Sequence, residues 1–262
     1  MAPAADSHSE LVREVAERSS SRLDLWATFI GRTTARTVAE IGVYRGAFAA
    51  HVLERCPSIE TYYMVDPWQH LDDWNKPANR DDETFERIFA EAMHKTRDHE
   101  PRRVVLRGRT TEVIGRIPDN SLDFAYVDGD HTLRGITIDL ARVHGKVRPG
   151  GWIAGDDFSP TVWQHGTDFE PTLVFPYAVY FAEAVGARIY GLPYRQFLIE
   201  KQPESGFAFV DLTGKYGDLG LRGQLSCTRS AAPGALAQPD RWRSVRPLVQ
   251  RVLRRSRRGR AG

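Results

Sequence analysis

One stretch constrains the fold of this chain more than any other, namely residues 38–48, which read VAEIGVYRGAF. A short apolar run carries the acid Glu40, a glycine turn follows, and then comes a pattern typical of a helix. Gly42 lets the backbone turn sharply and lets a ligand approach it closely. A helix that begins at such a turn offers free N–H groups to a carboxylate or phosphate. The stretch therefore predicts a strand, a tight turn and a helix, and the turn is either an ordinary connection or a ligand site.

The next predicted strand favours the ligand site. Residues 61–65 are rich in β-forming side chains and are followed by Asp66. In nucleotide-binding α/β folds, an acid after the second strand accepts hydrogen bonds from ribose hydroxyls. The glycines alone would not decide the matter, because the dinucleotide spacing G-x-G-x-x-G is absent from residues 38–48.

The remaining chain alternates predicted strands and helices, which is typical of a doubly wound, mostly parallel α/β sheet with right-handed crossovers. One or two helices precede the sheet over residues 7–30, with a run of serines at residues 19–21 as the expected break. Helices are expected at residues 47–55, 82–94, 133–146 and 177–185. Seven strands are expected at residues 37–41, 61–65, 103–106, 122–127, 152–154, 187–190 and 196–200, and a further one could form at 207–212.

Two predicted connections are unusually long. Residues 67–100 follow the second strand, and their first part is aromatic and polar without periodicity. Residues 159–176 follow the fifth strand. Because both leave the sheet at the carboxyl end of a strand, they lie on the same edge. We interpret the insertion at 67–100 as a lid over an active site, with an ordinary surface insertion as an equally weighted alternative.

Four acids form the sharpest chemical signal. Asp128 and Asp130 follow the fourth predicted strand, and Asp156 and Asp157 follow the fifth. Parallel strands end at the edge where open α/β folds bind ligands. Carboxylates crowded there repel one another, and a bound hard cation removes that repulsion. The oxygen-only set favours Mg²⁺ or Mn²⁺ over Zn²⁺. The alternative is one cofactor-binding acid, one helix cap and two solvated acids, and we favour the metal site.

Residues 37–201 resemble the class I S-adenosylmethionine-dependent methyltransferases. The resemblance rests on the pattern E-x-G-x-x-x-G, on the acid after the second strand, and on the sequence RPGG before the fifth strand. It implies a Rossmann-like class I methyltransferase fold, in which the glycine turn holds the methionine end of the cofactor and the second-strand acid holds the ribose. The turn after the third strand would lie near the adenine, although helix capping alone would explain its threonines. The cofactor-binding residues implied are Glu40, Gly42, Tyr44, Gly46, Asp66, Thr110 and Asp128.

Within that family, D-G-D after strand four and D-D after strand five resemble the metal-dependent sugar O-methyltransferases that act on macrolide and aminocoumarin sugars. The resemblance implies that Asp128, Asp156 and Asp157 bind the metal and that Asp130 is the base. A cation bridging two neighbouring hydroxyls would orient them for an in-line displacement, and the base would remove the proton. The alternative bases are His131 and His144.

The expected function is Mg²⁺- and S-adenosylmethionine-dependent methylation of a sugar hydroxyl, on a small molecule or a mannose- or glucose-containing oligosaccharide. A catechol-type small-molecule O-methyltransferase is the second hypothesis. Its relatives usually carry Asp-Asn at the second acid pair, so Asp156 and Asp157 favour sugars. A cofactor-binding scaffold without catalysis is the third hypothesis.

The length of 262 residues fits one α/β domain with extensions. We expect a helical extension at residues 1–36, a methyltransferase domain at 37–213 with its lid at 67–100, and a flexible tail at 214–262. The extension could support a homodimer. No long apolar run and no signal-like N-terminus are present, and two distant cysteines suggest no disulfide framework. A cytoplasmic location is the simplest expectation.

The tail is strongly basic. Residues 241–262 hold nine arginines and no acid, so residues 1–240 are net acidic. An acidic body argues against a nucleic-acid partner. Apolar residues recur in the tail at steps of three and four, so it could form a basic amphipathic helix in weak contact with an anionic membrane. We favour the alternative of a solvated tail.

Overall fold

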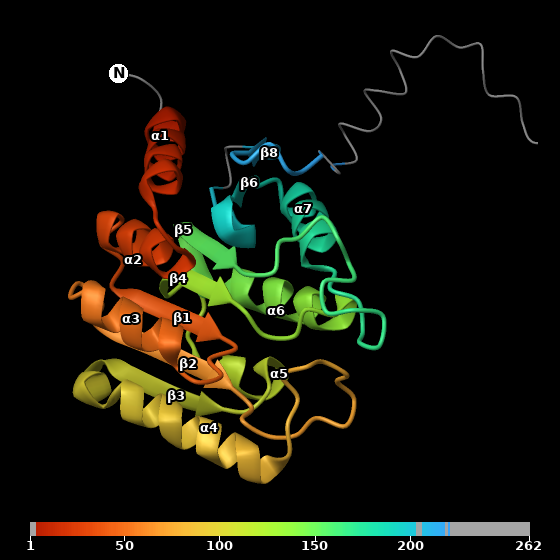
Figure 1. Cartoon of the computed structure of the whole chain (residues 1–262). Helices are drawn as coiled ribbons and strands as arrows, with labels where there is room; N and C mark the ends of the chain where they lie inside the picture. Colours follow the sequence, from red (N-terminus) through yellow and green to blue (C-terminus); the bar gives the residue numbers. More distant parts are fainter. Residues whose placement is uncertain (1–3, 203–205, 218–219, 221–262) are drawn as a thin grey trace, which may run out of the picture. The chain divides into compact units, whose positions relative to one another are not determined.

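The computed structural model describes residues 4–202, 206–217 and 220, and these form a central sheet with helices on both faces (Figure 1). They all fall in one compact unit. Residues 221–262, with the basic tail, lie outside the described residues, so its amphipathic helix and membrane contact stay predictions. Within the described residues, no helix is long and apolar enough to cross a membrane.

The sheet has the doubly wound topology that the alternating pattern predicts. Strands β1 to β5 are parallel, β7 runs antiparallel to β5 and β6, and β8 pairs with β6 in parallel. The strand at 207–212, an optional eighth in the sequence, is present as β8. The strand order is β3 (Arg103–Arg107), β2 (Thr61–Asp66), β1 (Thr37–Ile41), β4 (Leu122–Val127), β5 (Val147–Gly155), β7 (Gln196–Glu200), β6 (Arg188–Leu192) and β8 (Ala208–Asp211).

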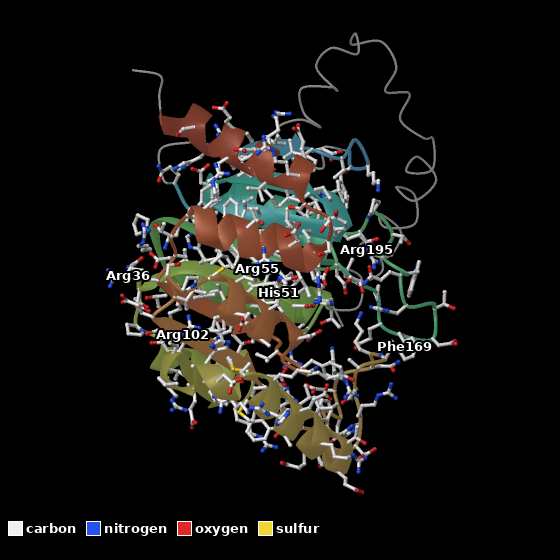
Figure 2. The ribbon with its side chains drawn as sticks, turned by 60° about the vertical axis from the view of Figure 1, so that its left-hand side comes forward. Arg36, His51, Arg55, Arg102, Phe169 and Arg195 are labelled. Carbon is white, nitrogen blue, oxygen red and sulfur yellow. The ribbon has the colours of Figure 1, made fainter. Side chains whose placement is uncertain are left out.

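Helices divide between the two faces (Figures 1 and 2). One face is covered by α1 (Ala4–Arg18), α2 (Arg22–Arg32), α3 (Ala47–Arg55) and α4 (Asp82–Lys95), and the other by α5 (Thr110–Val113), α6 (Leu133–Lys146) and α7 (Val174–Val185). Short 3₁₀ turns are η1 (Arg97–Arg102), η2 (Ile114–Arg116) and η3 (Pro193–Arg195).

The inner strands show why both faces are covered. On β4, Phe124 and Tyr126 belong to the core under α1 to α4, whereas Ala125 and Val127 belong to the core under α5 to α7. Side chains alternate between the faces of a strand, so successive apolar residues such as those at 124–127 need a helical layer on each side.

The serine run separates the first two helices as predicted. Helix α1 ends at Arg18 and α2 begins at Arg22, where the side chain of Ser21 accepts the N–H of Asp24. One predicted cap is wrong. The N-cap of α5 is Arg109 rather than a threonine, because the carboxylate of Glu112 accepts the backbone N–H of Arg109 at 2.9 Å.

Candidate active site

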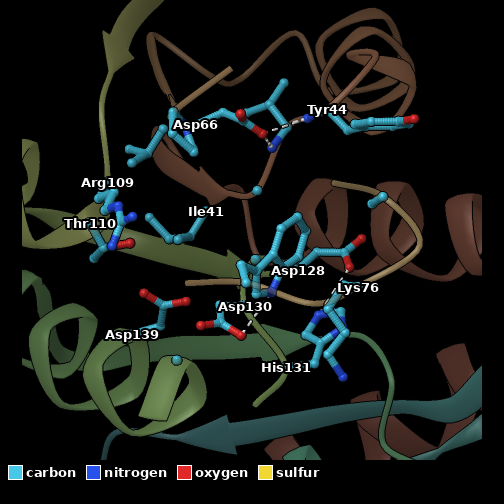
Figure 3. Close-up of a pocket in the computed structure, with 18 of the residues that line it drawn as sticks. Ile41, Tyr44, Asp66, Lys76, Arg109, Thr110, Asp128, Asp130, His131 and Asp139 are labelled. Atoms are coloured by element: carbon cyan, nitrogen blue, oxygen red, sulfur yellow. Dashed lines mark hydrogen bonds and ion pairs between the residues drawn. The ribbon is translucent and has the colours of Figure 1, made fainter. Parts of the chain in front are cut away.

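A cavity of about 530 Å³ lies at the carboxyl ends of β1, β2 and β4 (Figure 3). One half is bordered by the turn after β1 and by Asp66 at the end of β2. The other half is bordered by residues 128–131, by Asp157 and by His165. Parallel α/β sheets bind ligands at this edge, and the volume is typical of small-molecule sites. The cavity therefore brings the two sequence signals, glycine turn and acids, to one place.

The glycine turn adopts the conformation that its residues predict. Gly42 has φ +90°, and a Cβ there would overlap the carbonyl oxygen of Asp128. Gly46 is the N-cap of α3 with φ +69°, and a Cβ there would press on Ala92 of α4. Gly42 thus lets the β1 turn lie against the end of β4. Gly46 packs α3 against α4, and its contact with a cofactor stays a prediction.

Asp66 braces this turn (Figure 3). Its Oδ2 accepts the N–H groups of Val43 at 2.9 Å and Tyr44 at 2.8 Å, and its Oδ1 accepts that of Trp68 at 2.8 Å. Burial raises the pKa of Asp66, against the effect of these donors. A carboxylate has about four lone-pair positions, so one position on Oδ1 is left for a ligand hydroxyl. Asp66 lines the cavity although it is only 7% exposed.

Two more buried acids border the cavity. Glu40 accepts the hydroxyl proton of Tyr62 at 2.8 Å, and burial raises its pKa well above the usual value. Asp139 of α6 was not predicted. Burial raises the pKa of Asp139 to about 7, although a hydrogen bond from Thr110 opposes the shift. Thr110, at the start of α5, lines the cavity, and its contact with a cofactor stays a prediction.

The acids of the predicted metal site converge, but two basic side chains lie between them. Nη1 of Arg22 is 3.1 Å from Oδ2 of Asp128 and makes a close ion pair with Oδ2 of Asp156. Nδ1 of His131 is 2.6 Å from Oδ2 of Asp157, and its Nε2 is 3.4 Å from Oδ1 of Asp128. Among the residues that the structure describes, no group of three or more His, Cys, Asp or Glu is placed to hold a metal ion.

The pKa values follow from this pairing. Burial disfavours a charged His131, but the carboxylates of Asp128 and Asp157 beside its ring outweigh burial and raise its pKa to about 10. Burial also opposes ionisation of Asp157, yet the bond from His131 holds the pKa of Asp157 well below its usual range. Burial and the neighbouring charge of Asp128 raise the pKa of Asp156. At neutral pH His131 is therefore protonated, and both of its nitrogens face carboxylates.

A buried hydrogen-bond chain holds Asp156 in place. Gln196 of β7 donates from Nε2 to Oδ1 of Asp156 at 2.5 Å. The Oε1 of Gln196 accepts from Nε1 of Trp26 at 2.7 Å and from the hydroxyl of Tyr126 at 2.8 Å. Trp26 lies about one turn after Arg22 on α2. The helix that carries Arg22 is thus tied to the acid that Arg22 contacts.

The segment after β2 borders the second half of the cavity. Nε1 of Trp74 donates to Oδ1 of Asp130 at 3.1 Å. Nζ of Lys76 donates to the carbonyl oxygen of Glu170, in the second long loop, at 2.7 Å. These contacts hold the residues before Asp82 beside the cavity, and their role as a lid stays a prediction. Most of the remaining insertion is α4, which packs in the helical layer with α3 and contributes Phe85 and Lys95 to the border of the cavity.

The structure separates the three predicted bases. Asp130 and His131 line the cavity (Figure 3). His144 lies near the other end of α6, about 16 Å along the helix from its first residue. Its ring packs edge-on against Phe181 with the centroids 5.6 Å apart. The position of His144 therefore gives it no part in the cavity.

Arg22 and Asp139 were missed by the sequence reasoning. Arg22 is a single basic residue at the start of a helix whose apolar pattern indicates only packing, and its partners lie more than a hundred residues away. Asp139 could have been found. It occupies a buried position on α6 beside Ile136 and Leu140, and an acid on the apolar face of a helix is rare unless it is paired or functional.

Comparison with known proteins agrees with this geometry. Residues 39–158, which contain the glycine turn and all four strand-end acids, match the family described as methyltransferase domain. No curated protein matches the chain. The structure resembles that of a candidate caffeoyl-CoA O-methyltransferase from Staphylococcus aureus, with a TM-score of 0.51 and 15% identity, over 75% of this chain and 96% of that one.

Two other solved structures are similar at a lower level. An O-methyltransferase from Bacillus cereus in complex with SAH has a TM-score of 0.48 and 15% identity, over 77% of this chain and 93% of that one. The O-methyltransferase TomG from Streptomyces achromogenes, in complex with SAM, has a TM-score of 0.48 and 13% identity, over 74% and 90%. The strand order, the position of the cavity and the matched family lead to one conclusion. The described residues have the α/β Rossmann-like fold of the class I methyltransferases, and residues 39–158 match a methyltransferase domain.

Proposed function

We propose that the chain is an S-adenosylmethionine-dependent O-methyltransferase that methylates a hydroxyl of a sugar or sugar-containing small molecule. One observation carries the proposal, namely that a single cavity joins the turn braced by Asp66 to the polar half that contains Asp130. The first half suits a ribose and an amino-acid moiety. The second half suits a hydroxylated acceptor.

In this proposal the cofactor lies against the glycine turn. The open lone pair of Asp66 accepts a ribose hydroxyl, and Gly42 lets the ligand approach the backbone. When bound, S-adenosylmethionine supplies a methyl group on a positively charged sulfur, and the carbon–sulfur bond breaks as the new oxygen–carbon bond forms. Asp139 and Thr110, which interact with each other and line the cavity, are the candidates for contact with the adenine.

Asp130 is the proposed base that takes the proton of the acceptor hydroxyl. The indole N–H of Trp74 donates to one of its oxygens and so orients the carboxylate at the cavity. His131 is the weaker candidate, because its pKa is raised to about 10 and both of its nitrogens face carboxylates. A base that is already protonated at neutral pH cannot accept the proton.

The acceptor half favours a sugar. Its border contains Trp74, Lys76 and His165 together with the acids, which offers an aromatic face and several hydrogen-bonding groups to a ring with many hydroxyls. A catechol-type acceptor is the second candidate, because an aromatic ring could also pack against Trp74 and Leu71. The two classes differ in their need for hydrogen bonds, so a substrate panel separates them.

A divalent metal is the part of the sequence prediction that fits this site least. The carboxylates are the right chemistry for Mg²⁺, but Arg22 and His131 lie where the three acids converge. A metal ion would have to displace Arg22 from Asp128 and Asp156. We therefore derive no step through a metal ion.

The proposal is tested by calorimetric titration with S-adenosylmethionine, followed by turnover on a panel of sugars, nucleotide sugars and catechols with mass-spectrometric detection of methylated product. Methylation of a sugar supports it. Methylation of catechols alone supports the second candidate. Cofactor binding with no turnover on any acceptor class supports a scaffold without catalysis. If S-adenosylmethionine does not bind, the proposed function is wrong.

A further inference from the structure

We propose that Arg22 is a built-in cation that takes the place of a divalent metal between Asp128 and Asp156, so that this acid cluster binds no metal ion in the folded chain. A role of Arg22 in orienting the acceptor rests on the proposed function. The failure of the acid cluster to bind a metal ion does not rest on it, because that concerns only the chain and a free cation.

The first argument is the contact itself. One nitrogen of Arg22 lies within ion-pair distance of Asp128 and Asp156 together, from the ends of two neighbouring strands. A guanidinium stays protonated at any physiological pH. It therefore relieves the repulsion between these carboxylates, which is the task that crowded strand-end acids otherwise leave to a metal ion.

The second argument is that the position of Arg22 is built into the fold. Helix α2 is anchored by Leu25, Trp26, Phe29 and Ile30, which are all buried. The indole of Trp26 is joined to Asp156 through the fully buried Gln196. Since α2 and Asp156 share this buried connection, the backbone of Arg22 is held at a fixed position relative to the acids.

The third argument concerns the remaining acid. Asp157, the third predicted ligand, is paired with His131 on the other side of the cluster. The metal site that the sequence predicts takes oxygens from all three acids, and each of them already has a basic partner. Arg22 lines the cavity and its side chain is 35% exposed. The N–H groups that the acids do not use can therefore orient an acceptor oxygen.

The test is Mn²⁺ binding, measured by electron paramagnetic resonance and calorimetry on the full chain, for wild type, Asp156→Asn, Arg22→Gln and the double variant that combines the two substitutions. Arg36→Gln is the matched control, because Arg36 is an exposed arginine paired with Glu60. We expect wild type and Arg36→Gln to bind Mn²⁺ more weakly than ~1 mM. Arg22→Gln should bind at least ~10-fold more tightly, and the double variant should lose the gain.

Tight Mn²⁺ binding by wild type that Asp156→Asn abolishes would overturn the proposal, because a metal would then displace Arg22. A folded Arg22→Gln variant that binds Mn²⁺ no better than wild type would overturn it as well. If Arg22→Gln does not fold, Arg22→Lys replaces it. A lysine lacks the planar fork that bridges two acids, so a several-fold gain in Mn²⁺ affinity is expected and no gain contradicts the proposal. Failure of methyl transfer alters none of these readouts.

Discussion

Replacing Asp66 with alanine should separate the bracing of the glycine turn from the binding of the cofactor. The carboxylate accepts three backbone N–H groups at 2.8–2.9 Å and lines the cavity at the same time. Asp66→Ala leaves these donors without their partner. Asp66→Asn keeps the carbonyl-type oxygen for Val43 and Tyr44 but turns an amide N–H₂ towards the N–H of Trp68.

The magnitude follows from the bonds that each variant loses. A hydrogen bond to a charged group contributes about 1.5–3 kcal/mol, and an unsatisfied buried donor costs about 1–3 kcal/mol. Water from the cavity can reach part of the vacated site, and burial of Asp66 opposes its ionisation. We therefore expect Asp66→Ala to lower the free energy of unfolding by about 2–4 kcal/mol, and Asp66→Asn by about 1–2 kcal/mol.

Urea unfolding and calorimetric titration with SAH measure the two effects. Loss of a ribose hydrogen bond should weaken SAH binding at least ~10-fold in Asp66→Ala. Asp81→Ala is the control, because Asp81 caps α4 at an exposed site and should cost about 1 kcal/mol with no change in SAH affinity. Unchanged unfolding energy with lost SAH affinity would refute the bracing role, and unchanged SAH affinity would refute the ribose contact.

Three other outcomes are expected. Gly42→Ala forces a Cβ towards the carbonyl of Asp128 at φ +90°, so thermal unfolding should show a loss of at least about 1–3 kcal/mol. Asp130→Asn should lower the turnover number on the order of 10²–10⁴-fold with SAH affinity retained; a loss below tenfold would exclude Asp130 as the base. Burial raises the pKa of Asp139 from 3.8 to about 7, so wild type loses stability as pH rises from about 4 to 7, at about 1.4 kcal/mol per pKa unit. Asp139→Asn cannot titrate at this position, so its free energy of unfolding should rise relative to that of wild type by roughly 3–4 kcal/mol between pH 4 and pH 8 in urea unfolding. The same pH dependence of unfolding in both proteins would contradict the shifted pKa.

Local signals in the sequence were sufficient for the framework. β1 begins and ends at the predicted residues, 37 and 41, because a short apolar run bounded by a glycine turn has few alternatives. The run of serines separated α1 from α2 because a serine side chain caps the start of a helix, which is also a local effect. The convergence of Asp128, Asp156 and Asp157 also followed from the sequence, since parallel neighbouring strands end at one edge of a sheet.

What surrounds those acids was decided only by the tertiary structure. Arg22 meets Asp128 and Asp156 across more than a hundred residues, and no periodicity or spacing marks one arginine at the start of a helix for that contact. The three N–H groups on Asp66 likewise depend on how the β1 turn settles against β2. Strand ends are placed by local patterns, whereas the partner of a charged group depends on long-range packing. The sequence by itself therefore determined the fold and the positions of the acids, and only the tertiary structure decided that Arg22 is the cation between them.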